Sequence, residues 1–307
     1  MRRLLKLVLG LAGAVVVAAL VACLVMSPLS RAEAYAEFTR GWFKDWPFTR
    51  GHYLPTRFLP MLESAGIIQT VRYEVEPGIV FFVKPDDVIE NEILSGRIWD
   101  PEIWNWISSH LQPGSTMVDV GAHIGTMTIR GAKVVGTKGK VLAVEPNPNT
   151  AAKLRANVEA SGWPQVKIEQ VACGASDGKL DLFIGSRVNS GSSSLSKKNA
   201  EEHGASGTSV TVDLVKLDEL VERNGLTRID VIKVDVEGAE TQVITGGQES
   251  IRKFHPVLIL ETVDHMLRNM GSSFSELESL LGSLGYVRAR QSSDGDNTEY
   301  RWMPKGQ

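Results

Sequence analysis

The chain has 307 residues, of which 43% are hydrophobic and 22% are charged, a composition that can bury one large core. Its formal net charge of −3 gives no general attraction to nucleic acid, and no run of Lys or Arg interleaves with aromatic residues, so nucleic-acid partners are not expected. The two cysteines, Cys23 and Cys173, make neither a disulfide framework nor a metal site, and we expect a buried thiol at Cys173.

The first 30 residues predict a membrane anchor. Residues 7–26 carry no charge, and their number is close to the roughly 20 residues that cross a bilayer core. Two alternatives stay open, a cleaved secretory signal that ends in Ala32-Glu-Ala34 and a bacterial lipoprotein signal around Leu20-Val-Ala-Cys23. The anchor is favoured because the apolar run is longer than a usual signal core and continues past Cys23.

Residues 31–69 predict a linker between the anchor and the folded domain. Aromatic side chains such as Trp42 and Trp46 are spread there among basic ones such as Arg40 and Lys44. Such a segment forms an interfacial belt at the lipid headgroups or packs on the domain, and the sequence leaves both open.

The folded domain is expected to span residues 70–307, and the part before residue 114 predicts a hairpin followed by a helix. Two β-prone runs, 70–75 and 79–83, flank the turn signal Glu76-Pro-Gly78. Asp100-Pro101 then introduces a helical stretch that ends before the breaker Pro113-Gly114.

The remaining core, residues 114–307, predicts an α/β fold because strands and helices alternate along it. This alternation implies right-handed crossovers and a mainly parallel, seven-stranded sheet with helices on both faces. The expected strands are residues 116–120, 140–145, 166–171, 229–235, 257–261, 286–290 and 300–303, and the principal helices are residues 149–161, 239–246 and 275–284.

An insertion separates the third and fourth of these strands. Residues 180–184 and 209–214 predict two extra strands around a polar loop, residues 186–207, which contains Ser190-Gly-Ser-Ser-Ser-Leu195. Its composition suits a flexible linker, whereas connections of this length inside a compact domain are often lids or binding loops. Both interpretations stay open.

The stretch Thr116-Met-Val-Asp-Val-Gly-Ala-His-Ile-Gly-Thr126 predicts a cradle for a nucleotide cofactor. An apolar strand enters a turn in which Gly121 and Gly125 would let the backbone approach a ligand, and the first amides of the next helix would supply donors. The following strand ends in Glu145, the usual position of an acid that accepts hydrogen bonds from ribose hydroxyls. Together these features favour a cofactor that contains adenosine.

The spacing of the glycines disfavours an NAD-dependent oxidoreductase. Such enzymes prefer Gly-x-Gly-x-x-Gly, and here the second and third positions are His123 and Thr126. The pattern Asp119-x-Gly121-x-His123-x-Gly125, followed by Glu145-Pro-Asn147, instead resembles S-adenosylmethionine (SAM)-dependent methyltransferases of the FkbM family. Asp235-Val-Glu237-Gly238 and the strand ending in Glu261 resemble later motifs of that family, and the resemblance covers roughly residues 92–285.

The resemblance implies a Rossmann-like class I methyltransferase fold with SAM as its cofactor. It assigns Asp119 to the methionine part of SAM or to a bound water, Gly121 and Gly125 to close backbone approach, and Glu145 to the ribose. Three further cofactor-site residues have less definite roles. His123 would bond the turn or face the substrate, Asn147 would cap a helix or contact the ligand, and Asp177 would border the adenine or form a simple turn.

The candidate catalytic residues are acids at strand ends, because ligands of open parallel sheets bind beyond the carboxyl ends of the strands. Methyl transfer needs alignment, and a hydroxyl acceptor must also lose a proton. Asp235 and Glu237 are the best candidates for a general base or for gripping substrate hydroxyls, and helix capping is the alternative role. Glu261 and His265 are secondary candidates, and no His or Cys cluster demands a metal.

The sequence therefore predicts an O-methyltransferase that acts on a hydroxylated small molecule, a sugar, or a glycan or lipid headgroup near a membrane. The alternatives are a membrane-tethered binding module without catalysis and an NAD-dependent oxidoreductase. The basic residues before the anchor favour an exported domain, but those after it resist translocation. Because SAM is made in the cytosol, we expect a single-pass protein with a cytosolic domain.

Overall fold

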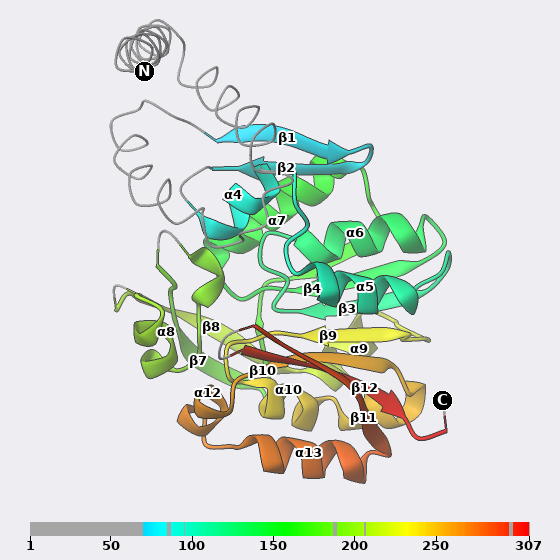
Figure 1. Ribbon diagram of the computed structural model, residues 1–307, viewed down its shortest axis with the longest axis vertical. Coiled ribbons are helices and arrows are strands. Elements are labelled where there is room, and N and C mark those ends of the chain that lie inside the picture. Colours follow the sequence, from blue (N-terminus) through cyan, green and yellow to red (C-terminus); the bar gives the residue numbers. More distant parts are fainter. Residues whose placement is uncertain are drawn as a thin grey trace, which may run out of the picture. The chain divides into compact units, whose positions relative to one another are not determined.

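The computed structural model describes residues 70–84, 87–94, 96–186, 189–205, 207–294 and 297–306 (Figure 1). The predicted anchor and linker lie outside these residues. Within the described part, no helix is both long enough and apolar enough to cross a membrane. The chain divides into two compact units, Met1–Arg72 with Val83–Arg97, and Tyr73–Phe82 with Ile98–Gln307.

The described part of the first unit is built around one short helix, α4 (Val88–Leu94), which the sequence analysis does not predict. The Asp87 carboxylate accepts hydrogen bonds from the backbone amides of Ile89 and Glu90, at 2.9 and 3.1 Å. These bonds satisfy two amides that a helix start otherwise leaves unpaired. The Glu90 carboxylate accepts a further bond from the Lys84 amide.

The second unit is organised by a seven-stranded sheet in the order β11-β12-β10-β9-β3-β4-β5. Its strands β3, β4, β5, β9 and β10 pair in parallel, while β12 is antiparallel to both β10 and β11. This order and single reversed strand are those of the class I methyltransferase fold, so the predicted α/β class and mainly parallel sheet are confirmed. The strands span Thr116–Val120 (β3), Lys140–Val144 (β4), Val166–Glu169 (β5), Val231–Val234 (β9), Val257–Thr262 (β10), Tyr286–Asp294 (β11) and Asn297–Pro304 (β12).

Helices cover both faces of this sheet, which is why its central strands are continuous apolar runs. Every residue of β3 and of β9 is buried. In Figure 1, α6 and α7 lie on one side of the strands and α10 and α13 on the other. The helices span Pro101–Ser109 (α5), Thr126–Val135 (α6), Pro148–Ser161 (α7), Leu217–Arg223 (α9), Glu240–Gly246 (α10), Gln248–Phe254 (α11), Asp264–Asn269 (α12) and Phe274–Ser283 (α13).

A second, three-stranded sheet has the order β6-β8-β7 and corrects the third predicted strand. That strand was expected to run over residues 166–171, but β5 ends at Glu169, and Ala172–Gly174 (β6) joins the other sheet. The two extra strands predicted in the insertion are confirmed as Gly178–Phe183 (β7) and Ser209–Lys216 (β8). Cys173 is buried as expected, and its burial raises the pKa of the thiol to about 12.

The predicted hairpin is confirmed as β1 (Val71–Glu76) and β2 (Ile79–Val83). Its turn is fixed by Trp163, whose indole Nε1 donates to the Gly78 carbonyl over 2.6 Å. The Glu76 carboxylate binds Arg130 and Lys133 of α6 at 3.0 and 2.9 Å. These ion pairs lower the pKa of Glu76, chiefly through Lys133, and they hold the turn against α6.

Candidate active site

The loop between β3 and α6 contains the predicted cradle glycines, and its packing explains both of them. Gly121 has a φ of +79°, and a Cβ placed there would lie 1.8 Å from the backbone oxygen of Asp235. Gly125 has a φ of +95°, and its Cβ would lie 2.6 Å from Cδ1 of Leu154. From their spacing, these glycines are expected to make room for a ligand. In the structure they first make room for the protein itself, since the loop lies against the end of β9 and against α7.

Replacing Gly121 with alanine is expected to destabilise the domain by more than about 3 kcal/mol, because a backbone contact must shift in addition to the strain of a positive φ. Gly114→Ala is the matched control. Gly114 has a similar φ of +90° but no atom within 4 Å of its Cβ position, so only the strain of about 1–2 kcal/mol applies. Urea unfolding of the two variants measures the difference, and equal losses would show that the contact with Asp235 is unimportant.

Glu145 follows β4 directly and connects the cradle loop to the next helix. Its carboxylate is buried and accepts hydrogen bonds from the amides of His123 and Asn147, at 2.9 and 2.8 Å. Burial raises the pKa of Glu145 to about 7, although the two amide bonds oppose the shift. Each carboxylate oxygen thus accepts one of these bonds and keeps a second lone pair for a ligand hydroxyl.

The raised pKa of Glu145 predicts a pH-dependent affinity for SAM. Bonds from ribose hydroxyls stabilise the ionised carboxylate, so binding must displace the proton when the pH lies below the pKa of the free protein. SAM affinity should therefore rise about tenfold per pH unit up to about pH 7 and then level off. Calorimetry across this range measures the slope, and Glu145→Gln should abolish it. A slope that persists in that variant would assign the titration to another group.

His123 and Asn147 flank this carboxylate and have distinct roles. His123 adopts a φ of +49°, and its Nε2 lies 2.8 Å from the Ser190 hydroxyl. Asn147 caps α7, because its side-chain oxygen accepts a bond from the Asn149 amide over 3.1 Å. The capping alternative is therefore the one the structure shows for Asn147, and His123 bonds to the insertion loop through its side chain.

Asp119 lies beneath the cradle loop and has no exposed surface. Its Oδ2 accepts a bond from the Thr128 hydroxyl over 2.6 Å, and its Oδ1 lies 3.5 Å from Nζ of Lys233. Burial raises the pKa of Asp119, and the charge of Lys233 opposes this. With these partners, Asp119 supports the loop from below, whereas contact with the methionine part of SAM stays a prediction.

Lys233 is a site residue that was not predicted from the sequence. It lies on β9 in register with Asp119, and its Nζ donates to the Gly121 carbonyl over 2.8 Å. The same nitrogen lies 3.1 Å from Asp235 Oδ2. Burial alone would lower the pKa of Lys233, but the charges of Asp235 and Asp119 outweigh it and raise the pKa. A lysine inside an otherwise apolar strand was the available signal, since lysine is rarely buried without a charged partner.

The structure brings the three predicted catalytic acids to one cavity. Asp235, Glu237 and Glu261 line a small, partly open cavity, together with Gly238, Glu240, Val263 and Met266. Burial and the charges of Asp235 and Glu240 raise the pKa of Glu237. The pKa of Glu261 is also raised, first by the charge of Asp235 and then by burial.

The turn before α10 is held by an acid that was not predicted. Glu240 is buried, and its Oε1 accepts bonds from the amides of Val236 and Gly238, at 3.2 and 3.1 Å. Ala239 occupies the capping position of α10 without a side-chain bond, so neither Asp235 nor Glu237 caps this helix. Their carboxylates thus lack the alternative role considered for them and face the cavity.

The insertion loop connects the cradle to this cavity. It contains a short 3₁₀ turn, η2 (Ser190–Ser192), and α8 (Lys197–Glu202). Besides the bond between Ser190 and His123, Asn147 Nδ2 donates to the Ser193 hydroxyl over 3.4 Å, and Ser194 donates to the Glu237 carbonyl over 2.8 Å. His265, the secondary candidate, pairs with Glu202 of α8 at 3.1 Å. These contacts are those of a binding loop or lid rather than of a free linker.

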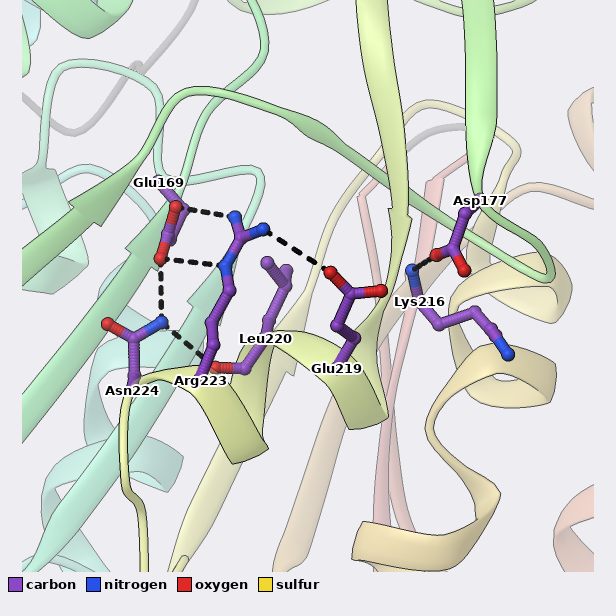
Figure 2. Close-up of polar contacts among 7 residues, drawn as sticks. All are labelled: Glu169, Asp177, Lys216, Glu219, Leu220, Arg223 and Asn224. Carbon is purple, nitrogen blue, oxygen red and sulfur yellow. Dashed lines mark hydrogen bonds and ion pairs between the residues drawn. The ribbon is translucent and has the colours of Figure 1, made fainter.

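Asp177 lies in the turn between β6 and β7. Its carboxylate is exposed and accepts a bond from the Lys216 amide over 2.9 Å, as Figure 2 shows. Lys216 in turn packs against Gly246, at the C-terminal end of α10, because a Cβ added to Gly246 would lie 3.4 Å from the Lys216 Cα. The acidic cavity lies at the other end of this helix, about 10 Å away. The turn interpretation is thus the one that the structure shows for Asp177, and a place beside the adenine stays a prediction.

Comparison with known proteins identifies the family. Residues 119–288 match the methyltransferase FkbM domain, which is more than half of the chain. The chain belongs to the FkbM methyltransferase family. The match decides between the two cofactors considered from the sequence in favour of SAM.

Two curated relatives of the FkbM domain carry informative names. The chain is 28% identical over 141 residues to the hexuronic acid methyltransferase AglP of Haloferax volcanii, covering 46% of this chain and 53% of the relative. It is 27% identical over 151 residues to the 2-O-methyltransferase NoeI of Sinorhizobium fredii, covering 46% and 61%. A crystal structure of methyltransferase FkbM from Methylobacillus flagellatus KT is 14% identical with a TM-score of 0.40, covering 80% of this chain and 59% of that one. The chain thus spans between half and two thirds of the two curated relatives.

The residues of the FkbM domain fit SAM. Glu145 keeps acceptor capacity at the position expected for the ribose, and the loop from Gly121 to Gly125 leads into the N-terminus of α6. Bound SAM would supply a methyl group already activated by its sulfonium. Among the described residues, no group of three or more His, Cys, Asp or Glu side chains could hold a metal ion.

Proposed function

We propose that the FkbM domain methylates a hydroxyl group of a sugar or another hydroxylated small molecule. The observation that carries the proposal is the acidic cavity beside the cradle. Asp235 follows β9, which pairs directly with β3, so this acid lies one strand spacing, about 4.8 Å, from the strand that enters the cradle. The acceptor hydroxyl would bind there and the cofactor next to it.

Two acids of the cavity have different roles: one holds the acceptor hydroxyl and the other removes its proton. Lys233 holds the Asp235 carboxylate in place, which suits it to accept a hydrogen bond from the acceptor. Glu237 has a raised pKa and makes the better base. The acceptor oxygen gives its proton to Glu237 as it takes up the methyl group. The hydroxyls of the insertion loop bond to His123 and to the Glu237 carbonyl, which suits the loop to limit the entry of water during transfer.

The names of the relatives support a sugar as the acceptor. One relative is a hexuronic acid methyltransferase and the other a 2-O-methyltransferase. The identities of 28% and 27% leave the particular acceptor a matter for experiment.

Transfer of a labelled methyl group from SAM tests the proposal. The protein is incubated with methyl-labelled SAM and a panel of monosaccharides and glycan headgroups, and label should appear as an O-methyl ether on at least one of them. The alternative function, a binding module without catalysis, predicts SAM binding with no transfer to any acceptor. Labelled product on nitrogen or carbon atoms alone would contradict O-methylation.

Anchoring to a membrane with a cytosolic domain stays a prediction from residues 7–26 and their flanking charges. Protease treatment of sealed cells or vesicles tests the orientation. In intact cells, a cytosolic domain should be digested only after the membrane has been permeabilised. Digestion of the domain from outside intact cells would show that it is exported.

A further inference from the structure

The turn that carries Glu237 has a backbone conformation that glutamate rarely adopts. Glu237 has a φ of +54°, in the left-handed region, and Gly238 follows with a φ of +107°. Such a conformation persists only where the surrounding structure fixes it. Glu240 fixes the turn from within, through its bonds from the amides of Val236 and Gly238. The Glu237 carbonyl is held by groups from outside the turn.

Two side chains of the insertion loop donate to this carbonyl. Ser194 donates through its hydroxyl over 2.8 Å, and Asn199 donates through Nδ2 over 3.0 Å. The same Nδ2 lies 3.2 Å from the carbonyl of Met266, another residue that lines the cavity. Asn199 has no exposed surface, and its Oδ1 accepts a bond from Asn269 over 2.6 Å. One buried amide thus holds the backbone of two residues that line the cavity.

Both donors are themselves fixed. The backbone of Ser194 pairs with that of Phe183, at the end of β7, through bonds of 2.9 and 3.0 Å. Ser196 caps α8, and its hydroxyl accepts a bond from the backbone amide of Asn199 over 3.3 Å. The packing is also close, since a Cβ on Gly238 would lie 2.5 Å from Asn199 Nδ2. The turn therefore rests on a fixed support.

We propose that Asn199 and Ser194 are positioning residues, which hold the turn so that the Glu237 carboxylate faces the acceptor. This inference rests on the proposed function and adds two residues to its machinery. Both side chains act through the backbone of Glu237 and not on the acceptor itself. The competing explanation is that they only fasten α8 to the domain. That explanation predicts a loss of stability without any change at the Glu237 carboxylate.

The titration of Glu237 reports where its carboxylate lies. Burial and the charges of Asp235 and Glu240 raise the pKa of Glu237, and the charge of Lys233 opposes them. Glu261, on β10, is the remaining acid of the cavity, and the charge of Glu237 contributes to its raised pKa. A carboxylate released from these surroundings reaches water and moves away from the neighbouring acids, so its pKa falls.

NMR titration of the full-length protein, labelled at the glutamate carboxyl carbons, follows this pKa without an acceptor, and Glu237→Gln identifies the signal. Asn199→Leu keeps the approximate size of the side chain but removes both donated bonds, so the pKa of Glu237 should fall toward its ordinary range. Ser194→Ala is a smaller change and should lower the pKa in the same direction. A folded Asn199→Leu variant that titrates like the unaltered protein would overturn the proposal. If that variant does not fold, an unshifted Ser194→Ala variant would overturn it.

Two control variants separate positioning from attachment. Lys198→Met removes a bond of 3.0 Å between α8 and Asn269 that does not involve Glu237. Gln165→Met removes a side-chain amide that also donates to two backbone carbonyls, at the far end of α6 from the cradle. Both should leave the pKa of Glu237 unchanged. A shift in either control equal to that in Asn199→Leu would assign the effect to general loosening and overturn the proposal.

Methyl transfer to the acceptor found with labelled SAM gives a second measurement. In Asn199→Leu, kcat should fall at least about tenfold, because a small displacement of a catalytic group is costly, while the KM for SAM stays the same. The rise of kcat with pH should move to lower pH, since the base acts when ionised. An unchanged kcat would overturn the proposal. Absence of transfer by the unaltered protein would instead contradict the proposed function, and the NMR titration judges the positioning separately.

Discussion

Replacing Glu237 with glutamine should reduce the rate of methyl transfer by about 10²- to 10⁴-fold, the usual contribution of a general base. Glutamine keeps the size of the side chain but cannot take a proton. Glu237 lies on a turn with a φ of +54°, in the cavity that also contains Asp235 and Glu261. Because Glu237 does not bond the cradle through its carboxylate, SAM affinity should stay the same. Single-turnover kinetics, together with calorimetry of SAM binding, measures both quantities.

Glu261→Gln is the matched control for this variant. Glu261 shares the cavity and also has a raised pKa, but it lies at the end of β10, one strand further from the cradle. It should therefore lower acceptor binding more than the rate of transfer. If Glu261→Gln stops transfer and Glu237→Gln does not, the two assignments must be exchanged.

Lys233→Met should destabilise the domain by about 3–5 kcal/mol, the cost of removing one partner from a buried ion pair. Methionine fills the space of the lysine stem but leaves Asp119 without its cation, in a position with no exposed surface. The Gly121 carbonyl also loses its donor. Protonation of Asp119 relieves part of this cost, so the loss should be larger at high pH than at low pH. Urea unfolding at several pH values measures it.

Lys167→Met provides the comparison within the same sheet. Lys167 lies on β5 in register with Leu142, but its side chain is exposed. Its replacement should change the free energy of unfolding by less than about 0.5 kcal/mol. Similar losses of unfolding free energy in both variants would show that the charge of Lys233 does not stabilise the domain.

The sheet and the cradle could be predicted because both leave local patterns in the sequence. Strands buried on two faces are continuous apolar runs, and the expected strands at residues 116–120 and 257–261 agree with β3 and β10 to within one residue. The glycines of the cradle were found by spacing, although their immediate cause is contact with Asp235 and Leu154. A glycine pattern thus marks a tight approach without saying what approaches.

The parts that could not be predicted depend on contacts between distant segments. Residues 166–173 are mostly apolar or β-prone, so nothing local shows that the chain leaves one sheet at Glu169 and enters another at Ala172. The bonds from Ser190 to His123 and from Ser194 to Glu237 join residues 67 and 43 positions apart. Only the folded sheet brings these groups together, and for this reason composition alone could not separate a lid from a linker.

Binding of SAM at Glu145 and the cradle loop is the central requirement of the proposed function. Calorimetric titration of SAM into the solubilised full-length protein and its Glu145→Ala variant tests this most directly. Glu169→Ala is the control, because Glu169 ends the neighbouring strand but pairs with Arg223 and Asn224 (Figure 2). The protein and the control should bind SAM with the same affinity. The folded Glu145→Ala variant should lose at least about 1–3 kcal/mol of the free energy of SAM binding. Unchanged SAM binding by the folded variant, or no binding by the unaltered protein, would contradict the account.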